Sequence, residues 1–210
     1  MSGTIVYPIK MQTNKVSEIP AKALGTTSNL ETIVVEKLEK NQLRKHWVMK
    51  DKNGDEIYSI VKNDYGIKDY LCGSFSKIVY NARNQPAFQI NRNASYLLDA
   101  PCIIISPNGD IMGYVEVNEG VLGYSFKIKN AEKKTILRIN RPALLQTTGF
   151  TDMVYKIYTK EDQKIGKIVK KRGSLKTLFE QPKYEVSFPI DLDAHLKCLI
   201  LSSVQLIKKF

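Results

Sequence analysis

Short runs of alternating apolar and polar residues, separated by turn-forming residues, fill most of the chain between residues 47 and 169. A period of two is typical of β-strands with one buried face. Asn53-Gly54 and Asn108-Gly109 lie between such runs, and glycine there accepts the positive φ that tight hairpins need. We therefore predict three strand–turn–strand hairpins and two weaker strand pairs: 47–52, 53–55 and 56–61; 102–106, 107–110 and 111–117; 155–158, 159–163 and 164–169; 77–80 with 88–90; and 124–128 with 135–139.

The C-terminal apolar segment is too short to cross a bilayer. Its longest charge-free stretch, Cys198–Ile207, has ten residues, or roughly 15 Å as a helix, whereas a bilayer core is about 30 Å thick. Apolar side chains nevertheless lie nearly all round the helical wheel, which a surface helix does not tolerate: Leu192, Leu196, Leu199, Ile200, Leu201, Val204 and Ile207. We expect the rest of the protein to enclose this helix. The predicted fold is all-β, a closed antiparallel β-barrel around one buried C-terminal helix.

Length and composition indicate one domain. A chain of 210 residues with 43% apolar content can bury a full core. Residues 1–30 are predicted to be a flexible lead-in, and residues 31–210 a single domain. The first 25 residues lack the apolar core of a secretory signal, and the cysteines at 72, 102 and 198 show no metal-binding spacing. Both features predict a reducing, cytosolic setting.

The chain is strongly basic, with a formal net charge of +11. Such a charge concerns partners, because anionic lipid surfaces and nucleic-acid phosphates both attract lysine and arginine. Lys164, Lys170 and Arg172 share parity on a predicted strand, which places part of the densest basic run on one side. That run, the candidate basic patch, consists of Lys164, Lys167, Lys170, Lys171 and Arg172. A solvated strand face, an anionic membrane surface and an acidic protein all fit it. Nucleic acid is the weaker choice, because no recognition helix or aromatic RNA-binding signature is present.

Catalytic chemistry finds little support in the sequence. His46 and His195 lie far apart, and no phosphate-binding loop, nucleophile elbow or metalloprotease motif occurs. We therefore expect a protein that is not an enzyme. Asp191 and Asp193 follow Pro189 where the terminal helix should begin, and we assign them to capping its free N–H groups rather than to a metal.

Several motifs resemble those of the phospholipid scramblase family. They are the stretch 165–168 (IGKI), the run 188–193 (FPIDLD) before an apolar segment, the 53–58 hairpin (NGDEIY), the stretch 112–115 (MGYV), and Arg141-Pro142. The resemblance extends from about Leu38 to Ile207. It implies a Tubby-like barrel of about twelve strands around a hydrophobic C-terminal helix. It also implies association with the cytoplasmic face of the plasma membrane, and calcium-dependent, ATP-independent movement of phospholipids between leaflets.

The family's calcium segment falls on residues 180–191, where this chain departs from the pattern. Carboxylates stand at Glu180, Glu185 and Asp191, the candidate metal residues. Pro182 removes a ligand, Lys183 brings a positive charge, and Glu185 occupies the position where an EF-type loop has glycine. We expect weak calcium binding at most, and calcium is the one cofactor the sequence leaves open. The cysteine cluster that relatives use for palmitoylation is missing, so membrane contact should be peripheral and electrostatic.

Two functions of different classes follow. The first is a scramblase-type protein on anionic phospholipid membranes at the inner face of the plasma membrane. The second is a Tubby-like scaffold or regulatory module that binds phosphoinositides or proteins and moves no lipid. The stretch 166–172 also lies where the first-described scramblase carries a nuclear import signal, which leaves a nuclear location as an alternative.

Overall fold

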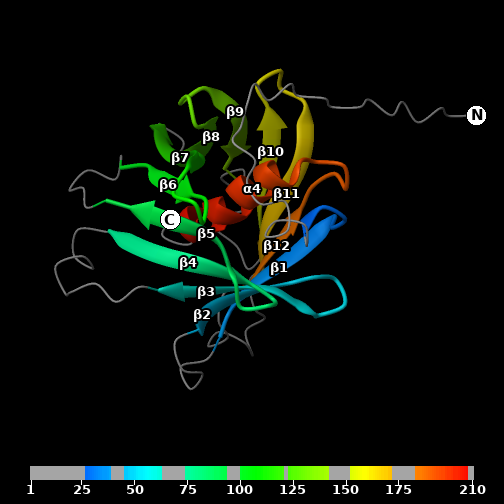
Figure 1. The fold of residues 1–210 in the computed structure, drawn as a ribbon. Helices are drawn as coiled ribbons and strands as arrows, with labels where there is room; N and C mark the ends of the chain where they lie inside the picture. The colour runs from blue at the N-terminus through cyan, green and yellow to red at the C-terminus, as the bar shows by residue number, and fades with distance from the viewer. Residues whose placement is uncertain are drawn as a thin grey trace, which may run out of the picture.

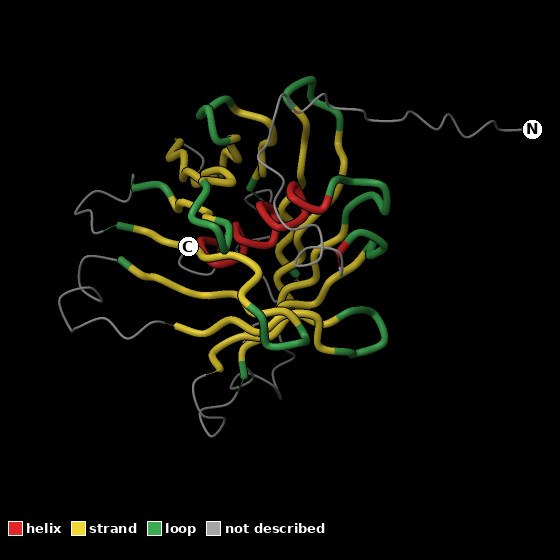
Figure 2. The backbone as a smooth tube through the Cα atoms, viewed as in Figure 1, coloured by secondary structure: helices red, strands yellow, loops and turns green. Residues whose placement is uncertain are grey.

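The computed structural model describes residues 27–38, 45–62, 74–93, 100–120, 123–141, 152–171 and 183–207. These residues form a barrel of strands with one helix running through it (Figure 1, Figure 2). The described part of the chain holds twelve strands and this helix: β1 Thr32–Lys37, β2 Lys45–Lys50, β3 Glu56–Lys62, β4 Phe75–Asn81, β5 Pro86–Arg92, β6 Cys102–Ile105, β7 Ile111–Gly120, β8 Gly123–Asn130, β9 Thr135–Asn140, β10 Met153–Thr159, β11 Lys164–Lys171, β12 Lys183–Ser187 and α4 Ala194–Ile207.

The sheet is a closed antiparallel meander. Each strand pairs with the next along the chain, and β1 pairs with β12 to close the circle. Closure leaves no exposed edge to recruit another chain. The predicted closed antiparallel barrel around a C-terminal helix is confirmed, and its strand number agrees with the one that the family resemblance implied.

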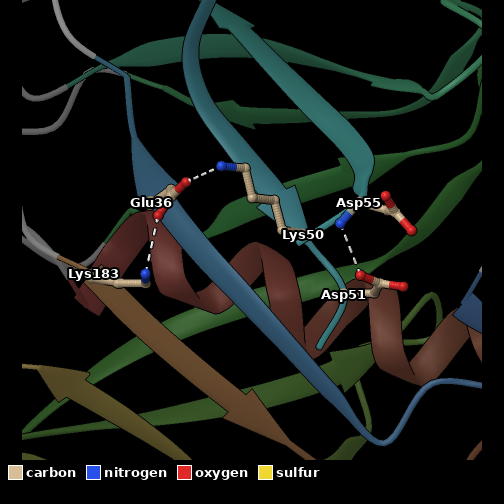
Figure 3. Close-up of polar contacts among 5 residues, drawn as sticks. All are labelled: Glu36, Lys50, Asp51, Asp55 and Lys183. Atoms are coloured by element: carbon tan, nitrogen blue, oxygen red, sulfur yellow. Dashed lines mark hydrogen bonds and ion pairs between the residues drawn. The ribbon is translucent and has the colours of Figure 1, made fainter. Parts of the chain in front are cut away.

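The tight turns between strands share one side-chain device. In the β2–β3 turn, Asp51 Oδ1 accepts hydrogen bonds from the backbone N–H groups of Asn53 and Asp55, at 2.9 Å each (Figure 3). Asn81 and Thr159 accept the corresponding pairs of bonds in their own turns. Such local acceptors favour turns over continued strands. Gly54 and Gly109 adopt φ values of 91° and 93°, as their Asn-Gly positions predicted.

Helix α4 fills the inside of the barrel. Its residues from Cys198 to Ile207 are fully buried. The polar ones among them bond inward to the helix backbone, since Ser202 Oγ donates to the Cys198 carbonyl and Ser203 Oγ to the Ile200 carbonyl. Burial also raises the pKa of the Cys198 thiol to about 12, which keeps it protonated and inert.

One strand residue must be glycine for the helix to fit. A Cβ atom on Gly113 of β7 would lie 2.4 Å from the Lys129 carbonyl oxygen and 3.0 Å from Leu199 Cδ1. The first distance is a clash with backbone that cannot easily move. The stretch 112–115, part of the family resemblance, thus has a packing role where the helix meets β7.

The helix is not apolar on every side, because Lys197 lies wholly inside the protein. Its Nζ donates to three backbone carbonyls, those of Thr27 at 3.0 Å, Ser28 at 2.9 Å and Ile190 at 2.7 Å. An ammonium group has three protons, so this set satisfies all of them. Desolvation lowers the pKa of Lys197. The lysine joins the stretch 27–30, which was predicted to belong to a flexible lead-in, to the start of the helix.

Among the described residues, no helix combines the length and apolar character required to cross a bilayer. Helix α4 has 14 residues, or roughly 21 Å at 1.5 Å per residue.

A charge placed inside the barrel should unfold the domain. We expect Leu201→Asp to abolish the cooperative thermal transition, because an unpaired buried carboxylate costs several kcal/mol, comparable to a typical total stability of about 5–15 kcal/mol. Ile190→Asp is the matched control, because Ile190 is 49% exposed just before the helix. Circular dichroism and thermal melting measure both. A folded Leu201→Asp variant that had lost only membrane binding would contradict the enclosed-helix reading.

Candidate functional site

The candidate basic patch does not lie on one side of β11. Lys164, Lys167 and Lys171 are exposed. Lys170 pairs in register with Met153 and Tyr184, which are both buried, and its Nζ lies 6.0 Å from the centre of the Tyr184 ring. Lys170 therefore points into the end of the barrel. Arg172, the last member of the candidate patch, lies outside the described residues.

A β-bulge explains the change of direction. The register between β10 and β11 shifts between Ile157 and Tyr158, so that Lys164 pairs with Tyr158 while Gly166 pairs with Ile157. One extra residue in β11 reverses the alternation of its side chains. The prediction that Lys164 and Lys170 share a face was therefore wrong.

Lys171 is held by acidic neighbours. Its Nζ lies 3.1 Å from Asp152 Oδ2 and 3.5 Å from Glu185 Oε2. The hydrogen bond to Asp152 is the main cause of a raised pKa for Lys171, with the nearby Glu185 charge adding to it. These groups are exposed enough that the pairs add little stability. Their effect is to cancel the lysine's charge locally.

A second acidic side chain, Glu36 on β1, neutralises two lysines at once. Its carboxylate pairs with Lys50 of β2 on one side and with Lys183 of β12 on the other (Figure 3). The hydrogen bond from Lys50 is the largest cause of its lowered pKa. The outer surface over β12, β1 and β2 is thus a mixed and balanced charge ladder.

The described part of the candidate calcium segment is extended rather than looped. Glu185 lies in the middle of β12, opposite Val34 and Val169, and its carboxylate binds Lys171. Asp191 is exposed in the turn before the helix, while Glu180 and Pro182 lie outside the described residues. Across the described stretches, no three His, Cys, Asp or Glu side chains gather as metal ligands would. The strand separates Glu185 from Asp191, whereas an EF-type loop wraps its carboxylates around one ion.

Asp193 caps the helix. Its Oδ1 accepts from the backbone N–H groups of His195 at 2.9 Å and Leu196 at 3.2 Å. The assignment of a cap to Asp191 was wrong, because the helix begins at Ala194 and Asp191 lies too far ahead of it. Leu192 likewise precedes the helix, and although it is buried, Leu196 is only partly buried. Of the two histidines, His195 contacts the Met112 carbonyl at 2.8 Å, and the side chain of His46 is outside the description.

A closed barrel wrapped around a buried C-terminal helix, with a basic outer wall, is the Tubby-like class of architecture. A solved structure of an Arabidopsis thaliana protein shares this fold with a TM-score of 0.55 at 9% sequence identity, over 88% of this chain and 96% of that one. The Scramblase family model matches residues 17–209. The chain therefore belongs to the scramblase family.

Curated relatives support the family at a modest level of identity. Mouse Phospholipid scramblase 4 is 30% identical over 103 residues, which cover 48% of this chain and 31% of that protein. Human Phospholipid scramblase 4 is 26% identical over a stretch of the same length. The aligned part of this chain spans less than a third of either relative.

Removal of the two aspartates should separate the cap from its neighbour. We expect Asp193→Ala to lower the free energy of unfolding by about 1 kcal/mol, because two helix N–H groups lose their acceptor. Asp191→Ala should change it little. Urea unfolding followed by circular dichroism compares the two variants. A larger loss for Asp191→Ala would mean that the cap had been assigned to the wrong residue.

Calcium should bind this chain poorly. We expect an affinity no better than about 10⁻⁴–10⁻³ M, the range of weak calcium modules, because Lys183 lies within the segment and Glu185 already pairs with Lys171. Calorimetric titration at micromolar calcium should give no saturable heat. A saturable signal that Glu185→Gln or Asp191→Ala abolished would show that the segment still forms a site.

Proposed function

We propose that this protein moves phospholipids between leaflets, without ATP and without covalent chemistry, from the cytoplasmic face of the plasma membrane. The match of the Scramblase family model to residues 17–209 is the observation that carries the proposal. The names of the mouse and human relatives point the same way. Because those matches cover only part of the relatives, activity and substrate remain proposals for this chain.

The enclosed helix favours action from the membrane surface. Eleven residues of α4 are buried by the barrel, so the helix offers almost no apolar surface to lipid while the barrel is closed. Headgroups must still cross about 30 Å of hydrocarbon. A protein bound at the surface can lower that barrier by gathering anionic headgroups and thinning the bilayer locally, because mismatch at the interface deforms lipid at modest cost.

We propose that this activity does not require calcium. Glu185 is already paired with Lys171, and Lys183 is already paired with Glu36, so an incoming ion would have to break an existing contact. Membrane attraction would instead come from the net charge of +11, which acts without calcium. The nucleus remains the alternative location.

The second candidate function is a scaffold that binds phosphoinositides or proteins and moves no lipid. The enclosure of the helix favours it, because Lys197 ties α4 to residues 27 and 28 and a barrel held in this way is a rigid binding body. This candidate shares the anionic membrane partner but not the transport step.

A leaflet-exchange assay separates the two functions. Purified full chain is added to vesicles of phosphatidylcholine and phosphatidylserine carrying a fluorescent lipid, and loss of fluorescence to an impermeant quencher reports exchange. We expect exchange at equal rates with calcium and with a chelator. Heat-denatured protein is the control. Binding to the vesicles without exchange would favour the scaffold, and exchange only with calcium would contradict calcium independence.

A further inference from the structure

Five basic side chains lie on the outside of neighbouring strands β8 to β11, on the wall of the barrel that these strands form (Figure 1). We name this set the basic face: Lys127, Arg138, Lys156, Lys164 and Lys167. One row across the strands runs Lys127, Arg138, Tyr158, Lys164, and in the next row Lys156 stands opposite Lys167. Neighbouring strands lie about 4.8 Å apart, so the five charges crowd a small area.

The registers set like charges directly opposite each other. Lys156 faces Lys167 across β10 and β11, and Lys127 faces Arg138 across β8 and β9. Like charges at such positions destabilise a sheet. Arg138 pairs with Asp162. Among the described residues, Lys127, Lys156, Lys164 and Lys167 form no ion pair.

The same sheet shows how such a clash is relieved elsewhere. Lys171 also faces a lysine, Lys183, but each of the two has acidic partners. Asp152 and Glu185 hold the first, and Glu36 holds the second. The sequence therefore places acids beside one pair of opposed lysines and omits them beside the other. Folding stability does not account for the basic face, and an anion from outside the protein does.

A membrane surface fits this face better than a strand of nucleic acid. The charges lie across the convex wall of a barrel, spread over four strands, rather than along a groove or a recognition helix. Tyr158 lies half-buried among them, between Arg138 and Lys164 in register. Tyrosine combines an apolar ring with a polar tip and is enriched where headgroups meet hydrocarbon.

We propose that the basic face is the surface with which this protein lies on a bilayer rich in anionic phospholipid, with Lys156 and Lys167 at its centre. The proposal deepens the proposed function and rests on it for the identity of the partner. It also replaces the basic run read from the sequence, because Lys170 points inward and Lys171 is neutralised.

Neutralising the central pair tests the proposal. Lys156→Gln/Lys167→Gln should weaken binding to vesicles of phosphatidylcholine with phosphatidylserine roughly thirty-fold at low salt, given the usual contribution of one lysine near an anionic surface. Binding of either protein to phosphatidylcholine alone should be weak. The melting temperature should stay level or rise, because the substitution removes a repulsion. A role in folding alone would instead lower it.

Lys52→Gln/Lys183→Gln is the matched control. It removes the same net charge from two exposed lysines on the other side of the barrel, and it leaves Glu36 paired with Lys50. We expect a loss of no more than a few-fold. Equal losses in the two variants would mean that net charge alone drives binding, which would overturn the assignment of a face. Unchanged binding in Lys156→Gln/Lys167→Gln would overturn it as well.

Two further outcomes separate this inference from the proposed function. Wild-type protein that binds anionic vesicles through Lys156 and Lys167 but exchanges no lipid would sink the transport function and support the face. Full lipid exchange by the double variant would support transport and overturn the face. Loss of binding to a single-stranded oligonucleotide, with vesicle binding intact, would show that the face takes a nucleic acid and would overturn the lipid partner.

Discussion

The enclosure of one helix by one sheet is the constraint on which the rest of this structure depends. A barrel of twelve strands has a lumen too wide for its own side chains to fill, and α4 supplies the missing apolar volume. The helix in turn is apolar on too many sides to exist in water. Neither part is stable without the other. Gly113 shows how closely they fit, since the helix packs against the backbone where any side chain would collide.

A buried cation joins the two ends of the described chain within this core. Lys197 binds carbonyls at Thr27 and Ser28 together with that of Ile190, so the segment before β1 and the turn before α4 are held by one side chain. Three matched acceptors are what make a buried ammonium tolerable. The consequence for function is that α4 cannot leave the barrel without exposing an unsatisfied charge. Function at a membrane is therefore expected from the outer wall rather than from the helix.

The outer wall divides into two parts with different electrostatics. Over β12, β1 and β2, acids and lysines alternate and cancel, as the pairs around Glu36 show. Over β8 to β11, lysines oppose lysines. Membership of the scramblase family gives this asymmetry a meaning that charge alone would not, because a basic wall on a lipid-associated protein has an evident partner.

The sequence by itself determined the strands, the hairpins and the buried helix, because these follow from local periodicity, from Asn-Gly turns and from the length of an apolar segment. It could not determine which charged side chains meet. A bulge opposite Ile157 turned Lys170 inward, and the closed register brought Lys156, which lies outside the basic run, against Lys167. Asp193 rather than Asp191 became the cap because the helix starts one turn later than its motif suggested. Lys197 finds acceptors about 170 residues away in the chain. Periodicity reports which face a residue occupies, but only closure of the barrel decides what lies across from it.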